Sequence, residues 1–175
     1  MKKILLAFLL LSLLTSCTLQ GQPYDYYTFS FTYPKSWQPM EQVSETYQSG
    51  QDYYWMGILE NLTVTSIKKE GESGASFSVA TLEQTDEPIA GIIDFMYAIH
   101  EEDMRNYGER PITVSGITGM SSTYERMWDG QWLDFHDVWV EYGPLVYLLS
   151  FRAEDLDQYQ KEMDMILESF TFKSK

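Results

Sequence analysis

The fold is decided by residues 117–152, which read ITGMSSTYERMWDGQWLDFHDVWVEYGPLVYLLSFR. Two turn signals divide this stretch: Asp129-Gly130, a dipeptide typical of two-residue hairpin turns, and Gly143-Pro144. The segments between these turns are expected to form an antiparallel meander, with strands over residues 117–128, 131–142 and 145–152. In the last strand both sets of alternate positions are largely apolar, so we expect a central strand covered on both faces.

Other segments predict shorter strands. Residues 27–33 alternate aromatic and hydroxyl side chains with a period of two, which is typical of a strand with one buried face. Pro34 is expected to end this strand, and Trp37 to follow in a turn. Further strands are predicted over residues 55–67, 75–82, 112–114 and 170–172, and irregular segments over residues 40–54 and 71–74.

Two segments show the spacing of an amphipathic helix. In residues 88–107 apolar side chains recur every three to four positions, with Asp86 as the expected N-cap and Gly108 as the expected end. In residues 154–169 a second apolar stripe follows acidic residues in the first turn, where the helix dipole favours them. Together with the strands, the helices predict an α+β fold in one domain over residues 24–175: a mainly antiparallel β-sheet flanked by two amphipathic helices.

The N-terminus predicts where the protein works. Two lysines precede an apolar run over residues 4–14, and residues 14–17 read LTSC, which contains the only cysteine. This order is typical of a signal peptide, and the last four residues resemble the lipobox of bacterial lipoproteins, whose cysteine carries acyl chains such as palmitate. We therefore expect a signal peptide over residues 1–16, a lipidated Cys17, and a polar tether that completes residues 17–23.

The implied location is the extracytoplasmic face of a bacterial membrane, with the protein held to lipid through Cys17. The apolar run is shorter than the roughly 20 residues that cross a bilayer, which disfavours a permanent transmembrane anchor. An ordinary secreted protein with an incidental cysteine is the alternative. After Cys17 no thiol remains in the sequence, so the folded domain is expected to have neither a disulfide nor a thiol nucleophile.

The chain is strongly acidic. It has 26 Asp and Glu residues against 12 Lys and Arg residues, a formal net charge of −14. The cations are sparse and scattered, whereas a nucleic-acid interface needs clustered cations, so nucleic acid is not expected as a partner. The same charge disfavours adsorption to anionic lipid headgroups and is expected to keep a tethered domain soluble and off the membrane.

The two histidines are the candidate metal ligands or general bases. His136 shares a strand face with Asp134, while Asp137 points away. The favoured interpretation of His136 is a polar surface face, because no second ligand pair has diagnostic spacing. His100 lies at the edge of the apolar helix stripe, where we favour a boundary residue with its polar tip in water. A divalent-cation site with the acidic residues 101–103 is the alternative, although consecutive helical carboxylates diverge around the axis.

Aromatic residues are the candidate recognition surface. Tyrosines and tryptophans gather within residues 24–37, and Tyr53, Tyr54 and Trp55 follow a polar segment. Such side chains suit an interface because they combine a large apolar area with a polar group. They equally build the core of a small β-rich domain. We favour a core role in general and take Tyr53, Tyr54 and Trp55 as the interface candidates.

The sequence resembles the PsbP-like domain family, which includes the extrinsic photosystem II protein PsbP and many bacterial lipoproteins. The likeness covers nearly the whole mature chain. It is carried by an aromatic strand followed by Tyr-Pro-x-x-Trp (residues 29–37), a central meander (residues 114–130) and a terminal helix that runs into Ser-Phe (residues 159–170). The resemblance implies an αβα sandwich that acts as a binding or assembly module, with no enzyme active site and no cofactor.

These features lead to one functional hypothesis and two alternatives. The leading hypothesis is a membrane-anchored, non-enzymatic binding or assembly module for an unidentified envelope protein. The first alternative is a module for divalent cations or a small ligand, using the acidic groups near His100 or His136. The second is a hydrolase with an unrecognised site. No residue is assigned as catalytic or as a metal ligand, because the sequence has no recognisable nucleophile motif or catalytic triad.

Overall fold

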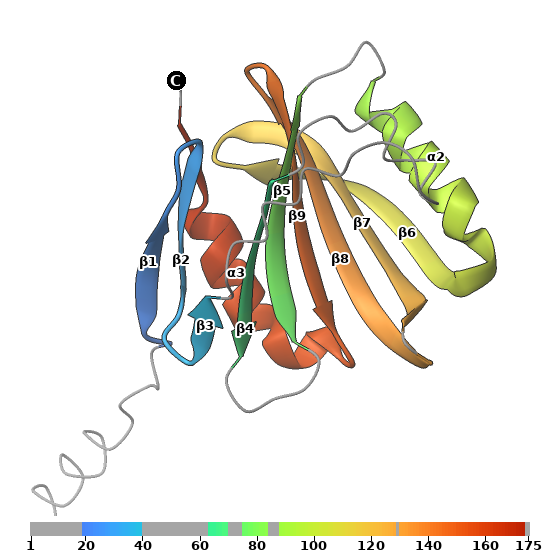
Figure 1. Cartoon of the computed structure of the whole chain (residues 1–175), viewed down its shortest axis with the longest axis horizontal. Helices are drawn as coiled ribbons and strands as arrows, with labels where there is room; N and C mark the ends of the chain where they lie inside the picture. Colours follow the sequence, from blue (N-terminus) through green and yellow to red (C-terminus); the bar gives the residue numbers. More distant parts are fainter. Residues whose placement is uncertain (1–18, 40–62, 70–74, 84–87, 129, 174–175) are drawn as a thin grey trace, which may run out of the picture.

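A computed structural model describes residues 19–39, 63–69, 75–83, 88–128 and 130–173 (Figure 1). Cys17 and the predicted interface residues Tyr53, Tyr54 and Trp55 lie outside these ranges. The described chain forms two antiparallel sheets, with a helix on either side of the larger one. The predicted α+β class, mainly antiparallel with two flanking helices, is confirmed. Neither helix within these ranges has the length and apolar character needed to cross a bilayer.

The smaller sheet joins the two ends of the described chain. Its order is β1 (Gly21–Asp25), β2 (Phe29–Pro34) and β10 (Thr171–Phe172), with β2 in the middle. Alternate residues of β2 are buried, as the aromatic and hydroxyl pattern predicted. Strand β1 includes the last residues of the predicted tether, so the first described strand begins at Gly21, before the predicted start near Tyr24.

The larger sheet has seven strands in the order β3-β4-β5-β9-β8-β7-β6. The predicted meander is confirmed almost residue for residue, and the predicted central strand lies fourth of the seven. The strands are β3 (Trp37–Pro39), β4 (Thr63–Lys69), β5 (Ser76–Glu83), β6 (Met104–Val114), β7 (Ile117–Trp128), β8 (Gln131–Tyr142) and β9 (Leu145–Ala153).

The first helix is shorter than predicted. Helix α2 spans Ile89–His100, a 3-10 turn η2 spans Glu101–Asp103, and the chain then enters β6 at Met104. Pairing with β7 overrides the helical periodicity there, because Met104 pairs with Arg126. Gly108 therefore lies in a strand and does not end a helix. The N-cap is Pro88, without a side-chain cap, and the predicted cap Asp86 lies outside the described residues.

The second helical segment has two parts. A 3-10 turn η3 (Leu156–Tyr159) leads into α3 (Gln160–Ser169). Ser169 fastens the end of α3 to the smaller sheet, since the backbone N–H of Thr32 donates to Ser169 Oγ at 2.8 Å. Trp37, expected in a turn, instead begins β3 and is buried. Its strand is held by pairing with β4, from Trp37 opposite Lys69 to Pro39 opposite Ile67.

The two faces of the larger sheet carry different cores. On one face, aromatic and aliphatic residues of β5, β8 and β9 pack against α3 and the smaller sheet. Phe77, Leu149 and Phe151 are fully buried there. On the opposite face a smaller cluster centred on Trp139 packs against Ile92 and Ile93 of α2. The larger core therefore fixes the fold, and the α2 face has room for a polar pocket.

Gly119 in β7 tests how closely the strands approach one another. A Cβ at this position would lie 2.2 Å from the carbonyl oxygen of Trp139, so the backbone must shift in Gly119→Ala. We expect the free energy of unfolding to fall by about 1–3 kcal/mol in urea denaturation. Gly108→Ala is the matched control, since its Cβ would meet nothing closer than 3.6 Å, and its expected change is within about 0.5 kcal/mol. Equal losses in both variants would contradict the prediction.

Candidate functional site

A polar pocket lies between helix α2 and the larger sheet. The strand register builds its floor, because Asp137 of β8 pairs with Ser122 of β7 on one side and with Ser150 of β9 on the other. Paired residues share a face, so these three side chains all point toward α2. Tyr97 and His100 of α2 complete the lining, together with Met104, Tyr107, Tyr124 and Arg126. The pocket has a volume of about 30 Å³, which is the space of one water molecule.

Asp137 is the centre of this pocket. It is 4% exposed, and it accepts hydrogen bonds from the hydroxyl of Tyr124 at 2.7 Å and from that of Ser150 at 2.5 Å. Burial raises the pKa of Asp137 above its ordinary value, although the two hydroxyl groups favour the charged form. Burial and the neighbouring Asp137 raise the pKa of Tyr124. The three side chains thus form a closed hydrogen-bonded network with its polar groups directed at one another.

His100 and Arg126 form the outer wall of the pocket. The guanidinium of Arg126 donates to Nδ1 of His100 at 3.1 Å. Burial, and then the charge of Arg126, lower the pKa of His100. His100 is half-buried, which agrees with the predicted boundary position, but the structure adds a specific partner for its ring. Glu101, Glu102 and Asp103 are all exposed and follow in the η2 turn.

A second, larger groove lies on the opposite face of the sheet, beside η3 and α3. Its volume is about 340 Å³, and its lining includes Arg110, Asp134, His136 and Gln160. Asp134 and His136 share this face, as predicted. The predicted surface position of His136 is wrong, because the residue is 7% exposed. Strand β8 lies inside the sheet, and both of its faces are covered, so the polar residues His136 and Asp137 in its middle are buried.

His136 has a serine partner, which raises the question of a nucleophile. Its Nε2 lies 2.7 Å from Oγ of Ser121, a distance suited to a serine–histidine pair. Ser121 is only 1% exposed, however, and does not line the groove. Asp134 does not complete a triad in the described contacts, since its carboxylate accepts from the backbone N–H of Leu156 at 3.1 Å. This arrangement supports a hydrogen-bonded buried histidine rather than an accessible nucleophile.

Metal ligation finds little support in the described part of the chain. Nowhere among those residues do three His, Cys, Asp or Glu side chains gather around a common point. The electrostatics of the groove point the same way, because burial and then the charge of Arg110 lower the pKa of His136. A cation nearby repels a metal ion as it repels a proton.

The network around Asp137 was not predicted from the sequence. A signal was present, because a two-residue turn at residues 129–130 fixes the hairpin register and places Ser122 opposite Asp137. Tyr124 lies two residues further along β7, on the same face. The burial of this network could not be predicted from the sequence, because it depends on α2 packing over this face of the sheet. The aromatic prediction was partly right: Tyr33 and Trp37 are buried, whereas Tyr27 is 86% exposed.

The raised pKa of Asp137 predicts how stability changes with pH. The folded state holds this proton more tightly than the unfolded chain, so folding stability falls as pH rises from the ordinary value of 3.8 through the raised pKa. Asp137→Asn stays uncharged, and we expect it to lose this part of the pH dependence in urea denaturation at a series of pH values. Asp94→Asn, at an exposed position on α2, should keep the wild-type slope. A wild-type slope in the Asp137 variant would refute the assignment.

Two arginines are expected to act on two different histidines. Arg110→Gln removes a repulsive charge and should raise the pKa of His136 without moving that of His100. Arg126→Gln should raise the pKa of His100 alone. The chain has only two histidines, so NMR titration of the ring protons resolves both, and each variant is the control for the other. A shift of both histidines in either variant would contradict the geometry.

The fold is similar to those of solved proteins. The solution structure of cyanobacterial PsbP (CyanoP) from Synechocystis sp. PCC 6803 gives a TM-score of 0.59 at 12% identity, over 91% of this chain and 96% of that chain. A crystal structure from Pseudomonas aeruginosa, described as a protein of unknown function and putative regulator, gives a TM-score of 0.52 at 16% identity. The match covers 83% of this chain and 92% of that chain. At such identities the likeness shows the fold alone. A comparison with curated proteins gives no match.

The family assignment rests on the sequence itself. Residues 15–172 match the family described as PsbP-like protein, which is most of the 175-residue chain. The match includes the aromatic strand, the meander and the terminal helix that carried the predicted resemblance. The chain therefore belongs to the PsbP-like protein family.

Proposed function

We propose that this PsbP-like protein is a lipid-anchored, extracytoplasmic binding module that holds its domain at a bacterial membrane to engage an envelope protein. The anchor is Cys17, and the domain performs no chemistry of its own. The observation that carries the non-enzymatic part is the position of Ser121. It is the serine within hydrogen-bond distance of His136, and it is closed off from the neighbouring groove.

The buried polar groups support the same conclusion. Asp137 uses its two carboxylate oxygens for Tyr124 and Ser150. A general base must reach a proton on a substrate, and the pocket around Asp137 has space for only about one water molecule. These groups are arranged to hold strands and helix together, and the surface above them is left for recognition.

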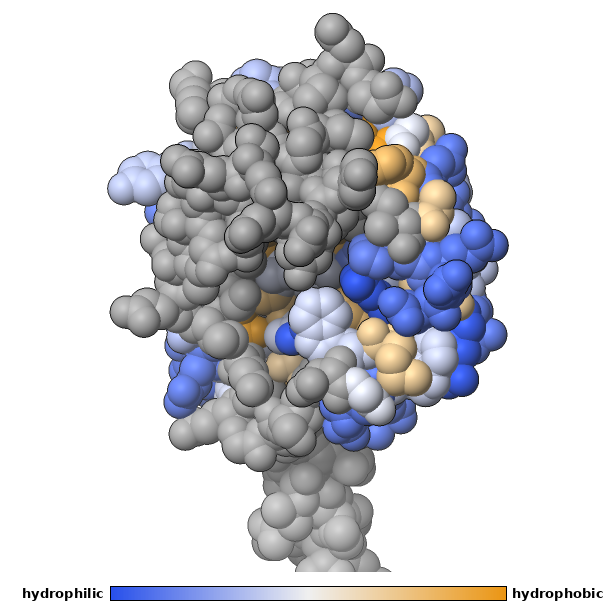
Figure 2. All heavy atoms as spheres, turned by 45° about the vertical axis from the view of Figure 1, so that its right-hand side comes forward, coloured by the Kyte–Doolittle hydropathy of each residue, from blue (hydrophilic) through white to orange (hydrophobic). Residues whose placement is uncertain are grey.

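The anchor is supported by sequence and by where the fold begins. Two lysines, an apolar run and the LTSC string precede the domain. Strand β1 begins at Gly21, four residues after Cys17. A lipid at Cys17 therefore leaves every described strand outside the bilayer. The surface agrees with a domain that works in water, because hydrophilic residues cover much of the described surface in Figure 2, with smaller apolar areas between them.

A second candidate function is binding of a small polar ligand in the groove beside α3. The groove has about 340 Å³, within the usual size range of ligand sites. Arg110 and Asp134 place opposite charges along it, which suits a ligand with both an acidic and a basic group. Calorimetric titration with free amino acids and short peptides tests this candidate. The heat of binding is expected to disappear in Arg110→Gln.

The lipid anchor has a direct chemical test. Cys17→Ser removes the sulfur that would accept the diacylglyceryl group, so we expect complete loss of labelling by a palmitate analogue in growing cells. The thermal stability of the purified domain should not change, because the first strand begins at Gly21. Mass spectrometry of the native N-terminus provides an independent measurement. An unmodified sulfur in the native protein would refute the anchor.

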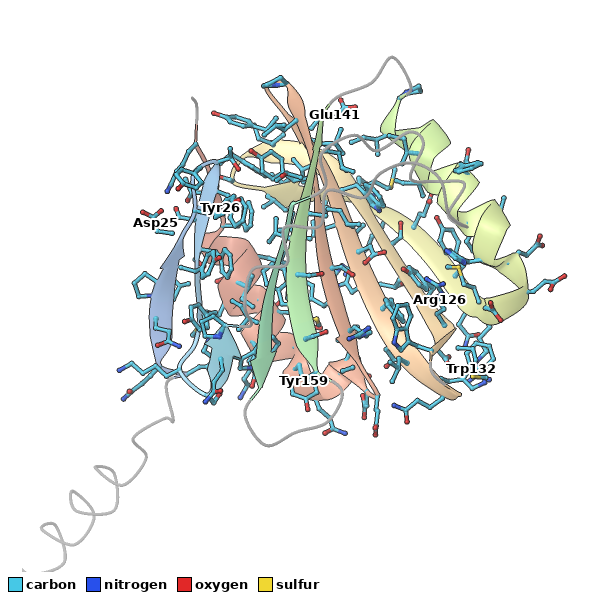
Figure 3. The ribbon with its side chains drawn as sticks, in the orientation of Figure 1. Asp25, Tyr26, Arg126, Trp132, Glu141 and Tyr159 are labelled. Carbon is cyan, nitrogen blue, oxygen red and sulfur yellow. The ribbon has the colours of Figure 1, made fainter. Side chains whose placement is uncertain are left out.

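The partner is tested by crosslinking in the native envelope. A photoreactive amino acid at Tyr54, a predicted interface residue, is expected to yield one reproducible protein adduct. The same probe at Glu141, an exposed position at the far end of the sheet (Figure 3), is the matched control and should not yield it. Trp55→Ala should reduce the Tyr54 adduct while leaving the amount of protein unchanged. No adduct, or the same adducts from both positions, would contradict the proposal.

A further inference from the structure

One edge of the domain collects the start of the fold and the tip of the β7–β8 hairpin. The strand register shows this step by step, from Gly21 opposite Pro34, to Trp37 opposite Lys69, to Ser76 opposite Arg152. Strand β8 starts at this edge, so the hairpin tip at residues 128–131 lies there as well. Figure 3 shows Trp132 at the lower end of the view, the end at which β1 begins in Figure 1. Glu141 lies at the upper end.

The hairpin tip presents tryptophan flanked by guanidinium groups. Trp128 is 44% exposed, one of two large hydrophobic residues in the described chain that are this open to solvent. The guanidinium carbon of Arg152 lies 5.1 Å from its ring centroid, and that of Arg126 lies 5.4 Å away. On the opposite face of the hairpin, the guanidinium of Arg105 stacks on Trp132 at 4.0 Å. The tip therefore combines flat apolar rings with fixed positive charges.

The two guanidinium groups beside Trp128 lack an anionic partner among the described residues. Arg105 is paired with Glu125, but no carboxylate forms an ion pair with Arg126 or Arg152 in that part of the chain. The Nε atoms of both arginines are buried and have no hydrogen-bond acceptor there. Arg126 also donates to His100, and its charge acts on the buried Asp137. Because these Nε atoms are buried, only the other parts of the two half-buried side chains can meet an external anion.

Acidic residues at the same edge define what kind of anion fits. Glu101–Asp103 immediately precede Met104, which pairs with Arg126, and Glu154 and Asp155 follow the end of β9. All of them are exposed. This edge thus places the positive charges of Arg126 and Arg152 beside Trp128, with carboxylates on either side. An acidic protein segment would meet repulsion from these carboxylates, whereas a zwitterionic headgroup offers a phosphate to the arginines and an ammonium to the acids.

We propose that the β7–β8 hairpin tip, with Trp128, Arg126 and Arg152, rests on the phospholipid headgroups of the membrane that carries the anchor. This inference rests on the proposed lipidation of Cys17. Strand β1 begins four positions after Cys17, a reach of about 14 Å, so the edge where β1 begins stays near the bilayer. Tryptophan is favoured at the headgroup level of membranes, and arginine binds phosphate oxygens through two parallel hydrogen bonds.

The acidic net charge is compatible with this contact. The acidic charge predicted a tethered domain held off the membrane, and the proposed contact departs from that prediction only at one local site and on zwitterionic headgroups. A short tether instead makes the contact intramolecular, at a high effective concentration. The anchored domain then needs only a weak local interaction to take up one orientation. That orientation leaves the far ends of both sheets, with Tyr27 between β1 and β2 and Glu141 in β8, facing away from the membrane.

The orientation is measured on the full lipidated protein in nanodiscs of phosphatidylethanolamine and phosphatidylcholine. Tryptophans are labelled with fluorine, Trp128→Phe assigns the Trp128 resonance, and lipids with a nitroxide at the headgroup broaden nearby signals. We expect loss of most of the Trp128 signal and retention of Trp139, which is buried toward the far end of β8. Tyr27→Trp adds a reporter at the far edge, and its signal should remain sharp.

A charge variant tests the role of the arginines. Arg126→Gln with Arg152→Gln should restore the Trp128 signal, while an unchanged Trp139 resonance shows that the fold persists. Arg110→Gln, on the opposite face of the sheet, is the matched control and should leave the Trp128 broadening intact. Equal broadening of Trp128 and the Tyr27→Trp reporter would overturn the inference, as would full broadening in the double variant.

The outcomes separate this inference from the proposed function. A sharp Trp128 signal in a protein whose Cys17 is acylated by mass spectrometry overturns the membrane contact and leaves the anchor standing. An unmodified Cys17 refutes the proposed function and removes the basis of the contact. If Trp128 stays sharp on nanodiscs and shifts instead on titration with hexaglutamate, the tip serves an acidic protein segment and the inference is wrong.

Discussion

The register of the β7–β8 hairpin is the constraint on which the rest of the structure depends. Every pair from Trp128 opposite Gln131 to Met120 opposite Trp139 keeps one alignment. A slip of one residue would exchange the faces of β8. Asp137 would then enter the aromatic core, and Val138 would face the pocket under α2. Both changes are costly, because the first buries a carboxyl group without its hydroxyl partners and the second removes apolar contacts from the core. The polar network around Asp137 and the aromatic core therefore select the same alignment.

Strand β8 carries two buried polar residues in adjacent positions, and each is satisfied on its own face. His136 meets Ser121 on the α3 side, and Asp137 meets Tyr124 and Ser150 on the α2 side. A strand of a two-layer domain with one solvated face would leave one of them in water. Here helices on both sides of the sheet make both positions internal. The cost of burying these groups is offset by hydrogen bonds, and the gain is an alignment with little freedom to shift.

The sequence predicted the parts of this fold that are encoded locally. Turn signals at residues 129–130 and 143–144 located the meander, and the two-residue alternation located β2. What it could not supply were contacts between distant segments. Residues 104–107 have helical spacing but belong to β6, because β7 offers a partner. The burial of His136 and of Asp137 arises the same way, from helices that return over the sheet. The helix stripe and the position of His100 were readable, whereas its partner Arg126 lies on a different element.

The smaller sheet ties the beginning of the chain to its end. Phe29 of β2 pairs with Phe172 of β10, and Ser169 bonds Thr32 across a separation of 137 residues. The main aromatic core includes residues from both termini of the domain. It therefore cannot close until β10 has been synthesised, and contacts of such long range form slowly. A chain that stays open until β10 is made suits threading through a secretion channel, which the proposed anchor at Cys17 requires.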